Sequence, residues 1–157
     1  ERLADEVELN VKALTELSHA ALTAMVPRGR GYLLKVSSVA SFQASPGVGV
    51  YDATQAYVTS LTEALHSEVK ASGVHGTALC PGLTKTEFQE NSNTDGLVSK
   101  VPGLAWTTVE QVASTGLRDV ASNKTLSVPG ALYKVAVTSS DILPRSITRF
   151  VSGSITR

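Results

Sequence analysis

A tyrosine, a glutamine and a serine in this chain are spaced so that their side chains could meet. Tyr51 and Gln55 are four residues apart, and a helix places residues four apart on one face. Ser38 lies thirteen residues before Tyr51, at the end of an apolar run typical of a strand. A phenol and a hydroxyl can together bind a substrate oxygen and exchange a proton with it, whereas a glutamine amide can only form hydrogen bonds. The structural alternative is a tyrosine at a helix start, followed by a solvated glutamine.

Two further groups of polar residues are candidates for the same site. Asn10 falls on an apolar stripe between Val7 and Leu14, where a polar side chain costs free energy unless it is hydrogen-bonded. Residues 81–86 form a Pro-Gly turn directly after an apolar run. Such a turn offers backbone groups and threonine hydroxyls to a ligand, or it merely ends the strand.

The spacing of apolar residues predicts the elements that would position these side chains. Helical spacing extends over residues 3–25, 50–71 and 108–121, and the last segment opens with a Thr-x-x-Gln capping pattern. Short apolar runs predict strands at 32–38 and 74–80, with a last short strand near 126–130. The order strand, helix, strand predicts a right-handed parallel crossover. We therefore expect an α/β fold with a doubly wound parallel sheet between helix layers.

Three other features carry expectations of their own. The polar segment 91–103 follows the end of a strand and is expected to form a mobile lid. The tail 131–157 is expected to form one or two amphipathic helices interrupted by Pro144. Lys35 lies inside an apolar strand, where alternation places it on the face opposite Val36 and Ser38. We therefore expect Lys35 at an edge or on the surface, and not as a source of charge for the site.

The pattern resembles that of the short-chain dehydrogenase/reductase (SDR) family. Members carry a helix Asn, a catalytic Ser, a Y-x-x-x-K motif thirteen residues after that Ser, and a P-G turn with a Thr four residues after the Gly. This chain has Asn10, Ser38, Tyr51 and the turn P81-G-L-T-K-T86. On sequence alone Ser37 is as plausible a hydroxyl as Ser38, and the family's spacing selects Ser38. The resemblance runs from A4-D-E-V-E-L-N-V-K-A13 through V36-S-S-V-A-S-F42 to L126-S-V-P-G130.

This resemblance implies a fold, an activity and a set of site residues. Residues 1–157 would form a single domain, the C-terminal part of an NAD(P)-binding, Rossmann-like SDR domain built as a three-layer α/β/α sandwich. The activity would be hydride transfer between a small-molecule alcohol and a ketone or aldehyde, with NAD or NADP as cofactor, in a homodimer or homotetramer packed through the two long helices. The catalytic residues would be Tyr51, Ser38 and Asn10. The cofactor-binding residues would be Gln55, Pro81, Gly82, Thr84 and Thr86.

Two departures from the family pattern bear on catalysis. Gln55 replaces the family's Lys, whose charge lowers the pKa of the tyrosine and whose ammonium holds the nicotinamide ribose. A cation about 5 Å away lowers the pKa of a tyrosine by about 1 to 3 units. Without this cation we expect a largely protonated Tyr51 and reduced activity. The T-G-x-x-x-G-x-G loop does not occur in the chain, so we expect the chain alone to bind cofactor weakly. The alternative is a catalytically inactive relic that serves as a dimerisation or binding module.

The composition excludes several other classes of protein. Fourteen basic and fourteen acidic residues give no net charge, so no field would draw the chain to nucleic acid. No apolar stretch reaches the roughly 18 residues that span a bilayer. The single Cys80 excludes an internal disulfide and a cysteine zinc cluster, and fits a reducing compartment. His19, His66 and His75 lack metal-binding spacing. We therefore expect no metal site and a cytoplasmic location.

Overall fold

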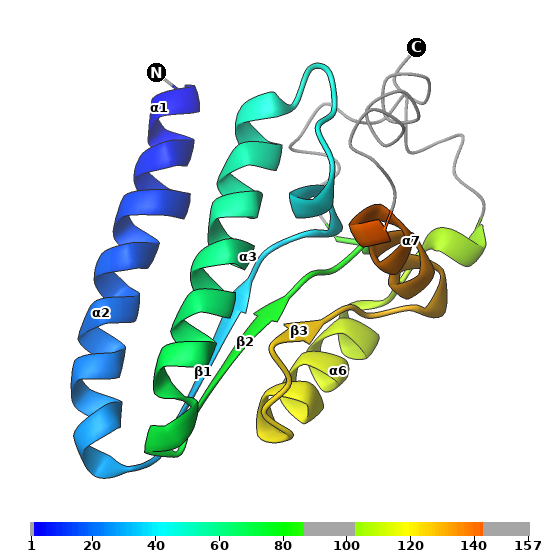
Figure 1. Ribbon diagram of the computed structural model, residues 1–157. Coiled ribbons are helices and arrows are strands. Elements are labelled where there is room, and N and C mark those ends of the chain that lie inside the picture. The colour runs from blue at the N-terminus through cyan, green and yellow to red at the C-terminus, as the bar shows by residue number, and fades with distance from the viewer. Residues whose placement is uncertain (1, 87–102, 143–157) are drawn as a thin grey trace.

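The computed structural model describes residues 2–86 and 103–142 (Figure 1). Three strands form one parallel sheet in the order β1-β2-β3: β1 (Gly31–Val36), β2 (Val74–Leu79) and β3 (Leu126–Ser127). The α-helices are α1 (Arg2–Val7), α2 (Leu14–Met25), α3 (Gly49–Val69), α6 (Val109–Ala121) and α7 (Ala131–Ile142). Short turns complete the elements: the π-helical η1 (Glu8–Ala13) and the 3-10 turns η2 (Val26–Arg28), η3 (Val39–Phe42), η4 (Lys70–Ser72) and η5 (Gly103–Ala105).

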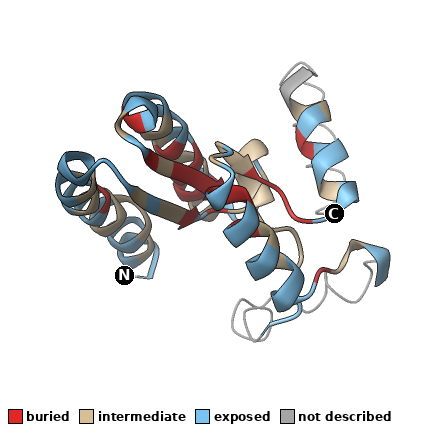
Figure 2. Ribbon diagram, turned by 90° about the horizontal axis from the view of Figure 1, so that it is seen from below, coloured by how far each residue is buried: buried red, intermediate tan, exposed pale blue. Residues whose placement is uncertain are grey.

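The sheet lies between two layers of helices. The helices α1, α2 and α3 lie on one side of it, and α6 lies on the other (Figures 1 and 2). Gly116 lets α6 approach the sheet closely, because a Cβ at this position would lie 2.9 Å from the side chain of Leu79 and 3.4 Å from that of Leu34. The helix α3 connects β1 to β2, which run parallel. The predicted α/β fold with three layers is therefore confirmed.

The predicted helices and strands occur close to their expected positions. The segment 3–25 is helical throughout, but its middle turn is the π-helical η1. The capping box is present at the start of α6: Thr108 Oγ1 accepts from the Gln111 backbone N–H at 3.2 Å, and Gln111 Oε1 accepts from that of Thr108 at 3.1 Å. The predicted lid lies outside the described residues except for Gly103, which begins η5, and so does the tail beyond residue 142.

The apolar stripe predicted along the first helix is only partly buried. Leu3, Val7 and Leu17 belong to this stripe by their spacing but are exposed, Leu17 to 71%. Polar side chains also join the helix to α3: Asn10 donates to Thr54, and the hydroxyls of Thr15 and Tyr57 lie 2.6 Å apart. Leu14 and Leu22 are half-buried, so α3 covers only part of the stripe.

Lys35 is buried, which contradicts its expected place at an edge or on the surface. Its side chain is 4% exposed, and Nζ has no hydrogen-bond partner among the described residues. The reason is the alternation of β1. Gly31 abuts Met25 of α2 and Ser37 reaches α3, so odd-numbered residues point into the helix layer. Burial lowers the pKa of Lys35 to about 8, because desolvation disfavours the ammonium form.

The outer edge of β1 pairs with no strand in the part of the chain that the structure describes. On its other edge, β1 pairs with β2 along its whole length, from Gly31 opposite Val74 to Val36 opposite Leu79. Tyr32 and Val36 are exposed on the face of β1 that α6 covers only in part. The unpaired edge that the sequence led us to expect is therefore present among these residues.

Candidate active site

Ser38 and Tyr51 meet at the carboxyl end of β1. Ser38 is the extended residue before η3, and its Oγ accepts a hydrogen bond from the Ala40 backbone N–H at 3.1 Å. The Ser38 side chain also forms a hydrogen bond with that of Tyr51, in the first turn of α3. The neighbouring Ser37 points into the layer between β1 and α3 and bonds to α3 there. The structure thus distinguishes the two serines, which the sequence alone did not.

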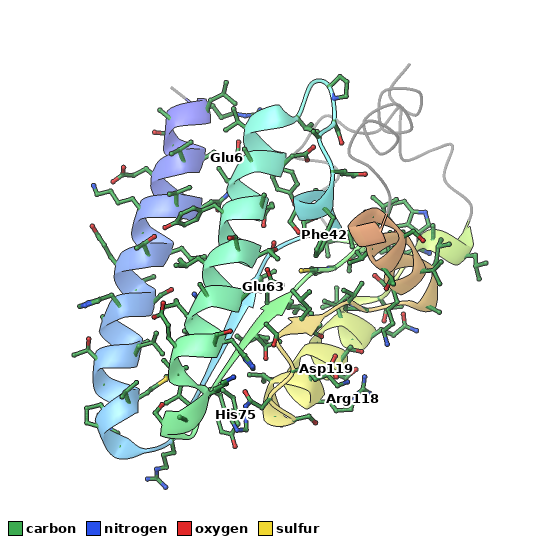
Figure 3. All side chains as sticks on the ribbon, in the orientation of Figure 1. Glu6, Phe42, Glu63, His75, Arg118 and Asp119 are labelled. Carbon is green, nitrogen blue, oxygen red and sulfur yellow. The ribbon has the colours of Figure 1, made fainter. Side chains whose placement is uncertain are left out.

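The surroundings of Tyr51 favour its protonated form. Burial is the largest effect and raises the pKa of Tyr51, and the carboxylates of Asp52 and Glu6 raise it further. The hydrogen bond with Ser38 acts in the opposite direction but does not outweigh burial. Glu6 lies on α1, beside the first turns of α3 (Figure 3). Among the described residues, no lysine or arginine shifts this pKa, so Tyr51 in these surroundings is suited to donate a proton rather than to accept one.

Gln55 lies one helical turn after Tyr51 and is buried. It is 8% exposed, which rules out the solvated glutamine considered as the structural alternative. Its Oε1 has no hydrogen-bond partner among the described residues, and its backbone oxygen accepts a hydrogen bond from Ser37 Oγ at 3.0 Å. An unpaired buried amide oxygen is an acceptor available to a hydroxyl donor.

Asn10 contacts the same turn of α3 from the π-helical η1. Its Nδ2 donates to Thr54 Oγ1 at 3.2 Å, and Thr54 Oγ1 donates to the backbone oxygen of Tyr51 at 2.9 Å. Asn10 is half-buried and hydrogen-bonded, as its position on the apolar stripe led us to expect. A π-helical turn inside an α-helix often marks a functional position. Asn10 therefore reaches Tyr51 through a single side chain.

The Pro-Gly turn lies beside the start of η3. The backbone N–H of Val39 donates to the oxygen of Pro81 at 3.0 Å, which brings this turn next to Ser38. Gly82 has no room for a side chain, because a Cβ there would lie 2.1 Å from the Tyr133 ring. The hydroxyl of Tyr133 accepts from the Leu83 N–H at 3.0 Å and donates to the Ala105 oxygen at 2.7 Å. Tyr133 of α7 therefore holds the turn, a role the sequence did not suggest.

Thr84 and Thr86 lie further along the same turn. Thr84 forms an isolated parallel bridge with Thr107, and their hydroxyls lie 3.1 Å apart. Thr86 is exposed. The structure thus brings Ser38, Tyr51, Gln55 and Pro81 into one region, and the threonine end of the turn pairs with the residue that lies two positions after η5.

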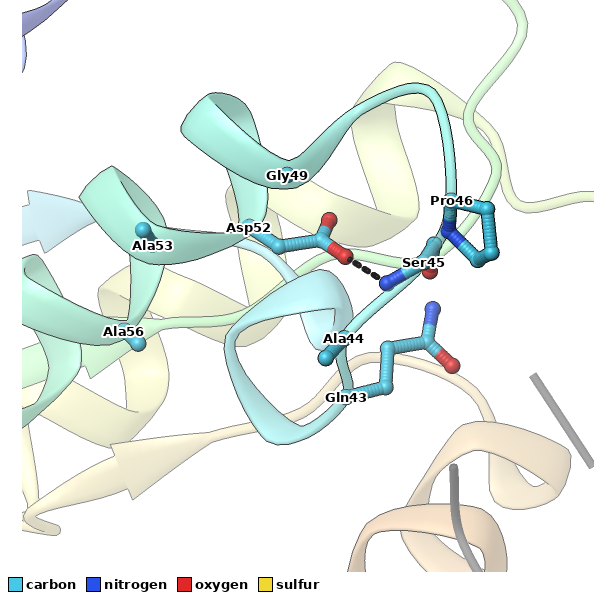
Figure 4. Close-up of a pocket in the computed structure, with 8 residues that line it drawn as sticks. All are labelled: Gln43, Ala44, Ser45, Pro46, Gly49, Asp52, Ala53 and Ala56. Carbon is cyan, nitrogen blue, oxygen red and sulfur yellow. Dashed lines mark hydrogen bonds between the residues drawn. The ribbon is translucent and has the colours of Figure 1, made fainter. Parts of the chain in front are cut away.

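A cavity of about 340 Å³ lies beside the first two turns of α3 (Figure 4). Gln43, Ala44, Ser45, Pro46, Gly49, Asp52, Ala53 and Ala56 line it. Asp52 is 4% exposed, and its Oδ2 accepts from the Ser45 backbone N–H at 2.6 Å. Burial raises the pKa of Asp52, an effect that this hydrogen bond only partly offsets. The sequence analysis missed Asp52, although its position next to Tyr51 could have drawn attention to it.

Within residues 2–86 and 103–142, no group of three or more His, Cys, Asp or Glu side chains is arranged to hold a metal ion. Over the same ranges, no helix is long and apolar enough to cross a membrane.

Comparison with known proteins agrees with this geometry. The family model described as short chain dehydrogenase matches residues 1–96, and the chain therefore belongs to the short-chain dehydrogenase family. Among curated relatives, gluconate 5-dehydrogenase of Gluconobacter oxydans (strain 621H) is 31% identical over 118 residues, which are 72% of this chain and 46% of that protein. An uncharacterised oxidoreductase of Myxococcus xanthus (strain DK1622) is 33% identical over 93 residues, or 59% of this chain and 37% of that protein.

Solved structures show the same fold. A short-chain dehydrogenase from Sphingobium yanoikuyae in complex with NADPH has a TM-score of 0.71 and 27% identity, over 86% of this chain and 51% of that one. A gluconate 5-dehydrogenase from Burkholderia cenocepacia J2315, in complex with NADP and tartrate, has a TM-score of 0.68 at 22% identity, over 85% and 55% of the two chains. The chain spans about half the length of the relatives it matches or less.

Proposed function

We propose that residues 1–157 are the C-terminal part of an NAD(P)-binding domain whose reaction is hydride transfer between an alcohol and a ketone or aldehyde. The observation that carries the proposal is the hydrogen bond between Ser38 and Tyr51 at the carboxyl end of a parallel strand. Ligands of doubly wound sheets bind at this end of the strands. The similarity to gluconate 5-dehydrogenase of Gluconobacter oxydans supports the same class of reaction, and so do the two similar structures that contain NADPH or NADP.

One side chain of the site offers a hydrogen-bond acceptor that suits a nicotinamide cofactor. The unpaired, buried Oε1 of Gln55 can accept a hydrogen bond from a ribose hydroxyl. We propose that Gln55 binds the ribose, and that Pro81, Gly82, Thr84 and Thr86 line the nicotinamide side. The bound cofactor would supply or accept the hydride.

The other residues would act on the substrate oxygen. Ser38 would hold this oxygen by a hydrogen bond, and Tyr51 would deliver a proton to it as negative charge develops. Asn10 would steady the turn of α3 that carries Tyr51, through Thr54. Since the pKa of Tyr51 is raised, carbonyl reduction, with Tyr51 as the acid, is favoured over alcohol oxidation.

We further propose that the exchange at Gln55 impairs catalysis. The test is Gln55→Lys in the full-length protein, assayed at neutral pH for alcohol oxidation with NAD and NADP, the direction in which Tyr51 must act as a base. Restoring a cation beside Tyr51 should raise this rate about 10- to 1000-fold, because each unit by which the pKa of Tyr51 falls increases the fraction of phenolate about tenfold. Tyr51→Phe should abolish the gain. Tyr57→Phe on the same helix should not, because Tyr57 faces Thr15 instead.

The second candidate is an inactive module that associates through its helices, and the exposed apolar residues of α1, η1 and α2 favour it. Leu9 and Leu17 are 68% and 71% exposed. If Gln55→Lys brings no gain while Leu9→Glu with Leu17→Glu dissociates an oligomer in light scattering, this reading replaces the enzyme. A homodimer or homotetramer and a cytoplasmic location stay predictions.

A further inference from the structure

A line of buried hydroxyls lies directly behind the candidate site. Ser37 Oγ bonds to the backbone oxygen of Gln55 at 3.0 Å and lies 2.7 Å from Thr59 Oγ1. Thr59 Oγ1 in turn lies 3.8 Å from Cys80 Sγ. Ser37, Thr59 and Cys80 are all buried, and they belong to the ends of β1 and β2 and to the middle of α3. Because these groups are buried, their hydrogen bonds are expected within the protein, as the distances above show.

Counting protons fixes the direction of the two short hydrogen bonds. The single proton of the Ser37 hydroxyl is donated to the carbonyl of Gln55, which can only accept. The 2.7 Å contact therefore requires Thr59 as the donor and Ser37 as the acceptor. The two hydrogen bonds therefore run in the same direction: Thr59 donates to Ser37, and Ser37 donates to the backbone of α3.

The backbone of Ser37 is also hydrogen-bonded, to the end of β2. Its backbone N–H donates to the oxygen of Leu79 at 2.7 Å, which extends the pairing of β1 and β2 by one residue. The residue therefore links β2 by its backbone and α3 by its side chain. The next residue is Ser38, and the carbonyl that Ser37 holds lies one helical turn after Tyr51.

We propose that Ser37 and Thr59 are positioning residues, which set the distance between Ser38 and Tyr51 by locking the end of β1 against α3. The proposal rests on the proposed function. A role limited to core stability would lower the stability of the protein without changing the Ser38–Tyr51 hydrogen bond. A positioning role changes that hydrogen bond, and misplacement of reacting groups by about 1 Å can cost about 100-fold in rate.

The test uses the full-length protein labelled with ¹³C at the ring carbon that bears the tyrosine hydroxyl. The signal of Tyr51, assigned with Tyr51→Phe, is titrated in Ser38→Ala, Thr59→Val, Ser37→Ala and the wild type. The charged groups that act on Tyr51, Asp52 and Glu6, are unchanged in all of these proteins. Because the Ser38 hydrogen bond lowers the pKa of Tyr51, Ser38→Ala should raise it. Thr59→Val and Ser37→Ala should each reproduce at least about half of that rise.

Thr62→Val is the matched control, and Thr59→Ser is the rescue. Thr62 is buried one turn further along α3, and among the described residues its hydroxyl bonds within that helix, to the oxygen of Val58 at 2.6 Å. Thr62→Val should leave the pKa of Tyr51 unchanged, and Thr59→Ser should keep the wild-type pKa. Where turnover is measurable, Thr59→Val should lower kcat about tenfold or more, with KM changed less than about twofold.

Two results would overturn the proposal. One is a folded Thr59→Val protein whose Tyr51 titrates as in the wild type. The other is loss of folding in both Ser37→Ala and Thr59→Val while Thr62→Val folds, because the hydroxyls would then serve the core as a whole. Since the titration needs no turnover, a protein without reductase activity whose Tyr51 responds as expected would reject the proposed function and retain the positioning role.

Discussion

Tyr51 has carboxylates for neighbours where an SDR reductase has a cation. Removing one of these charges should therefore make its phenol more acidic. Asp52→Asn keeps the size of the side chain and an oxygen to accept from Ser45, so the cavity and its loop should persist. We expect the pKa of Tyr51 to fall and any alkaline limb of an activity profile to move to lower pH. Titration of the ¹³C-labelled tyrosine measures the shift.

The control for that experiment is a charge removed far from the site. Glu110 lies at the start of α6 and is not among the groups that shift the Tyr51 pKa. Glu110→Gln should leave Tyr51 unchanged. An equal shift in both variants, or none in Asp52→Asn, would mean that Asp52 does not act on Tyr51.

Lys35 is a buried ammonium with no hydrogen-bond partner in the part of the chain that the structure describes, and it should destabilise the fold at neutral pH. Burial lowers its pKa from 10.5 to about 8, so the unfolded chain binds more protons between these values and stability should rise with pH over that window. Lys35→Met removes the charge and keeps the aliphatic part. We expect a gain of about 2 to 3 kcal/mol in the free energy of unfolding at pH 7, shrinking toward pH 10.

Urea denaturation at both pH values tests this expectation. Lys134→Met is the control, since Lys134 is exposed on α7 and its removal should change stability by less than about 0.5 kcal/mol. A gain in Lys35→Met that is the same at pH 7 and pH 10 would contradict the argument, because the penalty would not then come from the charge.

The connection between α6 and β3 depends on one buried carboxylate. Asp119 accepts hydrogen bonds from Lys124 Nζ at 2.7 Å and Ser127 Oγ at 2.8 Å, and Arg118 lies beside it (Figure 3). These bonds span a turn in which Asn123 has a φ of 52°. Burial alone would raise the pKa of Asp119, but the two hydrogen bonds and the charges of Lys124 and Arg118 hold it below its ordinary value. The contact therefore fixes how α6 leads into the sheet.

Asp119→Ala should destabilise the protein by about 2 to 3 kcal/mol, because it removes two hydrogen bonds to a charged group and leaves Ser127 buried without its acceptor. Because the folded pKa is depressed, the stabilisation is full above about pH 4 and is lost as the pH falls through the folded pKa. Thermal unfolding at pH 7 and pH 3 should show the difference between wild type and variant shrinking in acid. A difference independent of pH would point to lost packing instead.

The three described strands make a sheet with a free edge at β1, and the chain carries no T-G-x-x-x-G-x-G loop. That loop presents backbone N–H groups to a pyrophosphate. We therefore expect the 157-residue chain by itself to show no saturable NADPH binding up to about 1 mM. A Kd of about 1 mM corresponds to a binding free energy of roughly −4 kcal/mol. Fluorescence titration with NADPH measures this. Tight binding by the chain alone would contradict both this expectation and the division of the site proposed above.

Much of this architecture could be predicted from local patterns. The spacing of apolar residues predicted α3 and α6, the Thr108 capping pattern predicted where α6 begins, and the strand, helix, strand order predicted the parallel sheet. Helix faces and caps depend on residues within a few positions of one another, which the sequence displays directly. The spacing of Ser38 and Tyr51 likewise identified a pair of side chains that meet.

Other features depend on packing between distant segments, and only the tertiary structure decided them. Without the family's spacing, the residue types could not separate Ser37 from Ser38, because their difference depends on α3, whose Gln55 and Thr59 form hydrogen bonds with the Ser37 hydroxyl. The sequence placed Lys35 at an edge or on the surface, because alternation shows that the two faces of a strand differ but not which face is buried. The sequence also did not show that Glu6 acts on Tyr51, because Glu6 comes from another helix. Burial and electrostatic surroundings arise from segments far apart in the chain, so local periodicity could identify this site's residues but not their state of charge.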